Sequence, residues 1–233
     1  MKITWFGHSA FRIETGSSVL MIDPYLSGNP VFKGTVEEAA AGATHVALTH
    51  GHDDHVGDAA EICRTTGATL IAVYEICVYL AARGVEKYEP ANTGGTIHTD
   101  DFDVTFVRAD HSSSASGEGG GNVYLGNPCG LVITAREGRT VYHMGDTDIF
   151  AGMALIQELH QPDIGIVPIG DRFTMSPKRA ALACRKFFDF KTILPCHYGT
   201  FPLLLPSADG FVEAMGELGN RVAVPDVGGS IEV

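Results

Sequence analysis

Residues 48–58 read Leu-Thr-His-Gly-His-Asp-Asp-His-Val-Gly-Asp, and this stretch contains four potential metal ligands. These ligands are His50, His52, Asp54 and His55. Protonated imidazoles so close together would repel one another, and neutral imidazoles gain little from crowding. A divalent cation removes both problems, because it binds neutral nitrogens and an anionic oxygen that converge on one point. The stretch therefore predicts a metal site and directs the search for further ligands.

The composition is that of a soluble globular protein, with 45% hydrophobic and 19% charged residues in a chain of 233. We expect a single domain over residues 1–233, because no linker-like segment divides the chain. The formal net charge of −12 argues against nucleic acid as a partner, since binding a phosphate backbone needs a basic face. No segment resembles a signal peptide or a membrane span, so we expect a cytoplasmic protein with no membrane partner.

Short apolar or alternating runs separated by glycine-containing turns predict strands in both halves of the chain. Helix-start patterns follow several of these runs, such as the capping box of Thr35 and Glu38 and the cap candidate Asp58. This alternation favours an α/β (α+β) fold in which two sheets pack face to face and helices cover them outside. A last strand is expected around residues 221–224. The Ser- and Gly-rich residues 112–121 are expected to form a mobile loop.

Further ligands are expected at strand ends, because the loops that follow strands carry most site residues. The spacing of His50 and His52 lets them converge from a turn but not from one helix face. Asp54 and His55 begin the next predicted helix and can point to a second position. Three more candidates follow predicted strands: His111, Asp146 and His197. The resulting five histidines and two aspartates suit a dinuclear site with a bridging carboxylate and a free position for water.

The order His-x-His-x-Asp-His, a single His, Gly-Asp and a late His resembles the metallo-β-lactamase superfamily over the whole chain. Further segments are similar to the branch of metal-dependent hydrolases related to ascorbate-6-phosphate lactonase. These segments are Trp5-Phe-Gly-His-Ser-Ala-Phe11, Ile22-Asp-Pro24, Met144-Gly-Asp-Thr-Asp148, Ile169-Gly-Asp-Arg-Phe-Thr-Met175 and Pro195-Cys-His-Tyr-Gly-Thr-Phe201. The resemblance implies a four-layer αββα metallo-β-lactamase-like sandwich with the metals at one edge of the two sheets.

The resemblance also implies how two divalent metal ions would be bound. The first ion would have the ligands His50, His52 and His111. The second ion would have the ligands Asp54, His55 and His197, with Asp146 bridging the two. Classical dizinc β-lactamases have a cysteine at the position of Asp146. A harder oxygen bridge favours ester and phosphoester hydrolysis, and it makes zinc or manganese the expected metals, with iron or nickel as alternatives.

The expected activity is cleavage of a small ester, lactone or phosphoester by a metal-bound hydroxide, because coordination lowers the pKa of water to about 7. Asp54 or Asp146 would orient the nucleophile and accept its proton. His8, in the turn after the first strand, would bind substrate or protonate the leaving group, unless it serves only the turn. Tyr198 is either an oxyanion donor or a packing aromatic, and Arg172 is either an anion clamp or a surface ion-pair residue.

Asp23 and Asp148 are expected to orient ligand histidines or turns, whereas Asp53 and Asp58 are expected to be exposed or to cap helices. The substrate is expected to be a small molecule, and it can be anionic because a bound metal reverses the local field. Self-association through apolar stretches such as residues 201–205 is a further expectation. Two alternative functions stay open: an iron-dependent redox enzyme similar to persulfide dioxygenase, and a nuclease or phosphodiesterase.

Overall fold

The computed structural model describes residues 1–117 and 119–233. The described residues form two stacked β-sheets and a separate short hairpin. The first sheet has the strand order β15-β1-β2-β3-β4-β5-β6. Its strands are β1 (Lys2–Trp5), β2 (Phe11–Thr15), β3 (Ser18–Ile22), β4 (His45–Ala47), β5 (Thr69–Val73), β6 (Tyr88–Ala91) and β15 (Ser230–Glu232). Strands β3 to β6 run parallel, so helices must connect them across one face of the sheet.

The second sheet has the strand order β14-β13-β12-β11-β8-β7. Its strands are β7 (Thr96–His98), β8 (Phe102–Arg108), β11 (Cys129–Ala135), β12 (Thr140–His143), β13 (Ile164–Pro168) and β14 (Thr192–Cys196). Strand β11 is antiparallel to both β8 and β12, and β13 and β14 are parallel to β12. The carboxyl ends of β8, β12, β13 and β14 therefore lie at the same edge of this sheet.

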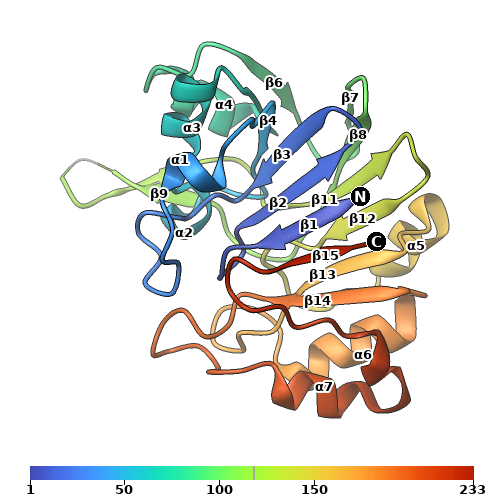
Figure 1. Cartoon of the computed structure of the whole chain (residues 1–233). Coiled ribbons are helices and arrows are strands. Elements are labelled where there is room, and N and C mark those ends of the chain that lie inside the picture. Colours follow the sequence, from blue (N-terminus) through green and yellow to red (C-terminus); the bar gives the residue numbers. More distant parts are fainter. Residues whose placement is uncertain (118) are drawn as a thin grey trace.

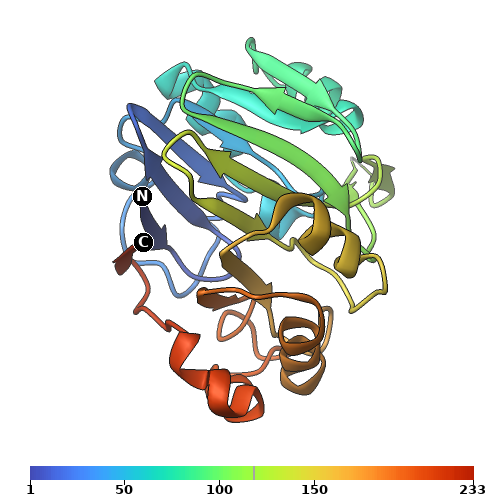
Figure 2. The same cartoon turned by 90° about the vertical axis from the view of Figure 1, so that its right-hand side faces the viewer.

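Helices cover the outer faces of both sheets, which gives the predicted αββα sandwich (Figures 1 and 2). On the side of the first sheet lie α1 (Val36–Ala39), α2 (Asp53–Val56), α3 (Ala59–Thr66) and α4 (Tyr74–Ala81). On the side of the second sheet lie α5 (Met153–His160), α6 (Pro177–Phe187) and α7 (Asp209–Met215), followed by the 3-10 helix Gly216–Arg221. None of the described helices is long and apolar enough to cross a membrane.

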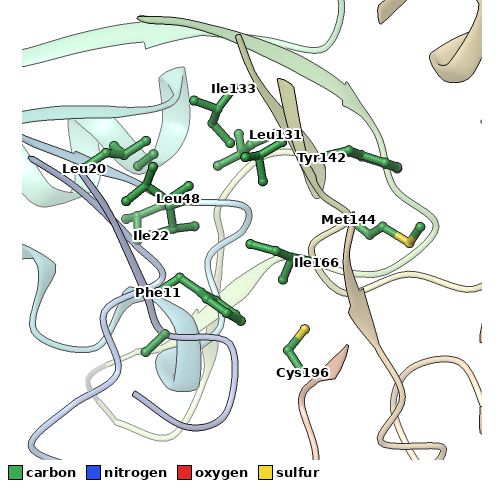
Figure 3. Packing of buried hydrophobic residues seen from close by; sticks show 14 of the residues in the cluster. Phe11, Leu20, Ile22, Leu48, Leu131, Ile133, Tyr142, Met144, Ile166 and Cys196 are labelled. Atoms are coloured by element: carbon green, nitrogen blue, oxygen red, sulfur yellow. The ribbon is translucent and has the colours of Figure 1, made fainter. Parts of the chain in front are cut away.

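Apolar side chains fill the space between the two sheets (Figure 3). Phe11, Ile22 and Leu48 from the side of the first sheet face Leu131 and Ile166 of the second. All five side chains are inaccessible to solvent. Burial of this kind is the main stabilising contribution to a fold, at roughly 25 cal/mol per Å² of apolar surface. The core therefore fixes the distance between the strand ends of the two sheets.

Three local predictions from the sequence are wrong in part. Residues 221–224 form no strand, because Val222 makes only an isolated bridge to Ile193, and the last strand is β15, paired with β1. The described part of the predicted loop, residues 112–117 and 119–121, is not all loop, because β9 (Ser114–Ser116) pairs with β10 (Asn122–Tyr124), and residue 118 lies outside the described residues. Asp58 is the N-cap residue of α3, as predicted, but it is buried and its carboxylate makes no cap: it accepts hydrogen bonds from the backbone of Leu26 and Ser27.

Candidate metal centre

The candidate ligands lie at one edge of the sandwich because each follows the carboxyl end of a strand. His50 and His52 are in the turn after β4, and the short helix α2 then presents Asp54 and His55. The other candidates follow strands of the second sheet: His111 after β8, Asp146 after β12 and His197 after β14. Thus the first sheet provides four of the predicted ligands and the second provides three.

The backbone at this edge adopts unusual conformations. His8, Asp23 and His197 have φ values of 52°, 44° and 59°, in the left-handed region that non-glycine residues rarely adopt. Gly170 is required beside His197, because a Cβ atom at this position would lie 2.2 Å from the His197 carbonyl oxygen. Rare backbone conformations concentrated in one place are typical of functional sites.

The first cluster consists of His50, His52 and His111, whose ring nitrogens converge. His50 Nε2 lies 2.9 Å from His52 Nδ1. The rings of His50 and His52 each lie 5.1 Å from the ring of His111, measured between centroids. The Ser112 hydroxyl lies 3.3 Å from His52 Nε2, on the other side of that ring. The spacing of two residues thus brings the two imidazoles together from a turn, as the sequence predicts.

The second cluster consists of Asp54, His55 and His197, with His8 beside them. His8 is fully buried, and both of its ring nitrogens have partners: Nε2 lies 3.0 Å from Asp54 Oδ2 and Nδ1 lies 3.1 Å from the Thr200 hydroxyl. Burial and the neighbouring His197 lower the pKa of His8 to about 4, so His8 is neutral at pH 7. An ionised carboxylate only accepts hydrogen bonds. His8 therefore carries its proton on Nε2 and donates a hydrogen bond to Asp54 Oδ2.

The Asp146 carboxylate lies between the two clusters. Its Oδ2 is 3.5 Å from His111 Nε2, 3.4 Å from His55 Nε2 and 3.0 Å from His197 Nε2. One oxygen atom therefore contacts a histidine of the first cluster and two histidines of the second.

Two buried polar atoms at the centre of this arrangement are poorly satisfied among the described residues: Asp146 Oδ1 has no hydrogen-bond partner, and His55 Nε2 has only the 3.4 Å contact with Asp146 Oδ2. Unpartnered buried polar atoms are rare in folded proteins, because each costs about 1–3 kcal/mol. A divalent cation would satisfy both atoms. The set of imidazole nitrogens and carboxylate oxygens therefore fits zinc, manganese or iron.

Asp23, which directly follows β3, interacts with one histidine of each cluster, with His55 directly and with His50 through Thr49. It is fully buried, and its Oδ2 accepts hydrogen bonds from His55 Nδ1 (2.8 Å) and from the Thr49 hydroxyl (2.6 Å). The Thr49 oxygen lies 3.0 Å from His50 Nδ1. Since Thr49 gives its proton to Asp23, it accepts one from His50. Asp23 therefore fixes the proton on Nδ1 of both His50 and His55, which leaves Nε2 of each ring free to bind a cation.

The protein surroundings favour the cation-binding protonation state at His50, His52, His111 and Asp146, but not at His55. Burial lowers the pKa of His50, His52 and His111, so these rings are neutral. Burial opposes ionisation of Asp146, but His197 and His55 hold the pKa of Asp146 well below its ordinary value. Burial also opposes a charge on His55, but Asp146 and Asp23 hold the pKa of His55 well above its ordinary value. A cation at His55 Nε2 would take the place of a proton there.

The β9–β10 hairpin is attached to the turn that carries the first cluster. The Gly51 backbone N–H donates to the Ser113 hydroxyl, and the Ser116 hydroxyl donates to Asp53 Oδ2 at 2.6 Å. Leu125 packs so closely on Gly51 that a Cβ at residue 51 would lie 2.6 Å from it. The hairpin therefore has a positioning role toward His52. The sequence composition predicts only mobility for this segment.

The structure bears on the alternative roles predicted for Tyr198, Asp148 and Arg172. Tyr198 is 7% exposed and its ring stacks on Trp5 with centroids 5.2 Å apart, which favours packing over oxyanion binding. Among the described residues, Asp148 has no hydrogen bond to a ligand histidine: its carboxylate binds Arg179 and accepts from the Ile149 backbone N–H at 2.8 Å, which supports the predicted role in the turn and not the one toward the ligand histidines. Arg172 is exposed and makes no ion pair in the described part of the chain. The sequence does not point to Thr49 or Thr200 as site residues, because only their hydrogen bonds in the folded chain, to Asp23, His50 and His8, indicate such a role.

Comparison with known proteins agrees with this fold. The sequence profile of the β-lactamase superfamily domain matches residues 2–197. A UPF0173 metal-dependent hydrolase of Methylocella silvestris is 56% identical over 229 residues, which are 98% of each chain. The fold and this match place the chain in the β-lactamase superfamily. More narrowly, the chain belongs to the UPF0173 family of metal-dependent hydrolases.

Solved structures agree with this assignment. Igni18, a metallo hydrolase from the archaeon Ignicoccus hospitalis, has a TM-score of 0.85 and 35% identity, with 100% of this chain and 98% of that chain covered. An isothiocyanate hydrolase from Delia radicum gut bacteria has a TM-score of 0.78 at 18% identity, with 100% and 99% covered. The second comparison concerns the fold alone.

Proposed function

We propose that this protein is a hydrolase that uses two divalent metal ions, zinc or manganese, to cleave a small ester, lactone or phosphoester. The observation that carries the proposal is the position of Asp146, whose Oδ2 lies within 3.5 Å of histidines from both clusters. A buried carboxylate in contact with two ligand groups is the arrangement expected of a bridging ligand.

Each ion would have its own set of ligands. His50, His52 and His111 would bind the first ion, and Asp54, His55 and His197 the second. Asp146 would be shared between them. Divalent ions in these positions would polarise the substrate's carbonyl or phosphoryl oxygen and lower the pKa of a water molecule to about 7.

The two aspartates differ in what they can reach. The side chain of Asp54 is 32% exposed, whereas that of Asp146 is 3% exposed. A proton acceptor has to meet substrate or water, so we assign this role to Asp54. Its Oδ2 already accepts a hydrogen bond from His8 Nε2–H. The other oxygen, Oδ1, would therefore be the atom that takes a proton from water. His8 acts through Asp54, because it is fully buried and has both ring nitrogens paired.

Metal quantification combined with a panel of lactones, phosphodiesters and thioesters tests the proposal. We expect two equivalents of metal in the wild-type protein. Asp146→Ala should lose both metal and hydrolysis, because both clusters contact that carboxylate. Glu61→Ala is the matched control, since Glu61 is an exposed carboxylate of the neighbouring helix α3 and is not a proposed ligand. Wild-type protein without metal and without rescue by zinc or manganese would contradict the proposal, and a single equivalent of iron would favour redox chemistry.

A further inference from the structure

A cleft of about 710 Å³ opens beside His111, next to the first cluster. Its walls come from the turn before β7, the end of β8 and the segment before β11. The residues that line it include Thr93, Arg108, Asp110, His111, Asn127 and Pro128. Because His111 belongs both to this wall and to the candidate metal centre, a substrate bound at the centre can extend into the cleft.

Arg108 lies in the cleft with most of its hydrogen-bonding groups unused. Its side chain is 70% exposed, and its Nε–H donates to Asp110 Oδ1 at 2.7 Å. The guanidinium carbon lies 5.7 Å from the centroid of the Phe150 ring. Among the described residues, the Nη1 and Nη2 groups of Arg108 have no hydrogen-bond partner, whereas Arg136 uses both of these groups on Asp103. The Nε of Arg108 is therefore held by Asp110, whereas Nη1 and Nη2 are free to bind a ligand.

Asn127 adds a second donor to the same cleft. Its Oδ1 accepts a hydrogen bond from the Tyr124 hydroxyl at 3.1 Å, so the oxygen of the amide is already engaged. Its Nδ2 has no hydrogen-bond partner in the described part of the chain, so both N–H donors of that side chain are unused. The unused groups of Arg108 and Asn127 are thus all N–H donors, which suit an oxyanion.

We propose that this cleft binds a carboxylate or phosphate group of the substrate, with Arg108 and Asn127 as the specificity-determining residues. The inference rests on the proposed hydrolytic function and names the substrate class more narrowly. The protein as a whole has a net charge of −12 and repels anions at a distance. An anionic substrate therefore needs a local group of donors of this kind. Asp110 occupies one side of Arg108, so the anion would bind on the opposite side, at Nη1 and Nη2.

Matched esters test the proposal on the metal-loaded protein. Phenyl acetate is neutral, whereas 4-acetoxybenzoate and 4-acetoxyphenylphosphonate carry an anion on the same leaving group. We expect Arg108→Met to lower kcat/KM for the preferred anionic ester about tenfold relative to phenyl acetate, which is the effect of one charge-assisted hydrogen bond at an exposed site. Arg64→Met removes the same charge from the exposed surface of α3 and should leave this ratio unchanged. The two anionic esters distinguish a carboxylate from a phosphate site.

A binding measurement separates this proposal from the proposed function. The metal-loaded wild-type protein should bind 4-hydroxybenzoate or 4-hydroxyphenylphosphonate more tightly than phenol, and Arg108→Met should weaken that binding about tenfold with the metal content unchanged. This result would support the cleft even if no ester were cleaved. Hydrolysis with the same anion selectivity in wild type and Arg108→Met would overturn the cleft while leaving the hydrolase intact. Loss of selectivity in Arg172→Met but not in Arg108→Met would also overturn it.

Discussion

Replacing Thr49 by valine should weaken metal binding at the first cluster and leave the second cluster intact. Thr49 is fully buried, and its hydroxyl makes two hydrogen bonds: it donates to Asp23 Oδ2 at 2.6 Å and accepts from His50 Nδ1 at 3.0 Å. Valine keeps the branched shape but cannot accept the His50 proton. His55 keeps its own hydrogen bond to Asp23, so the second cluster retains its orientation.

The size of the effect follows from where the His50 proton can go. Without the hydroxyl, the proton of His50 can move to Nε2, where His52 Nδ1 lies 2.9 Å away and accepts it. This tautomer blocks the nitrogen that would bind metal. Restoring the binding tautomer leaves Nδ1–H buried without a partner, at a cost of about 1–3 kcal/mol. We therefore expect a loss of about 10–100-fold in affinity for one of the two metal equivalents.

Competition with a chromophoric chelator, starting from the metal-free protein, resolves the two equivalents. Thr44→Val is a matched control, because Thr44 also lies next to a histidine and its hydroxyl is 2.9 Å from His45 Nδ1, but His45 belongs to neither cluster. Thr44→Val should change the free energy of unfolding without changing metal affinity. Binding of both metal equivalents to Thr49→Val as tightly as to wild type would refute the prediction.

Two further predictions concern His8 and the thiols. His8→Gln should keep both metal equivalents but lower kcat about 10–100-fold, because Asp54 loses its oriented hydrogen bond. Metal analysis and steady-state rates measure these two quantities. A kcat equal to that of wild type would disprove the prediction. Burial raises the pKa of Cys63, Cys77 and Cys184 to about 12, so these thiols stay protonated at pH 8 and native protein should resist iodoacetamide until it is denatured. Mass spectrometry counts the modified cysteines, and rapid modification of the native protein would contradict the burial argument.

The sequence predicts the candidate site well because ligand chemistry is local. His50 and His52 are close in the chain, so their convergence needs only a turn at the end of β4. His111 and Asp146 are recognisable because each follows an apolar strand. The rule that strand ends meet at one sheet edge then places them together, and the structure agrees.

What the sequence does not predict depends on partners far away in the chain. Ser116 reads as part of a flexible loop, yet its hydroxyl donates to Asp53, 63 residues earlier in the chain. Asp58 precedes a helix and reads as a cap, yet its carboxylate binds the backbone of Leu26 and Ser27. Nothing in the sequence singles out Arg108, and the role proposed for it rests on the cleft beside His111.

The division of the ligands between the sheets links metal binding to the stability of the fold. His50 and His52 of the first cluster follow β4 of the first sheet, whereas their partner His111 follows β8 of the second. The second cluster is divided in the same way, since His55 comes from the first sheet and His197 from the second. Neither sheet alone provides a complete set of ligands.

Metal ions bound at these clusters would therefore join the two sheets at the edge where the apolar core ends. A ligand that binds only the folded state stabilises it by about 2.7 kcal/mol at a concentration 100 times its Kd. Without metal, the spacing of the strand ends depends on core side chains such as Phe11 and Ile166. The core then serves the site as well as the fold, because it sets the separation across which Asp146 contacts His111, His55 and His197. A core substitution that shifts one sheet against the other should thus reduce metal affinity without changing any ligand.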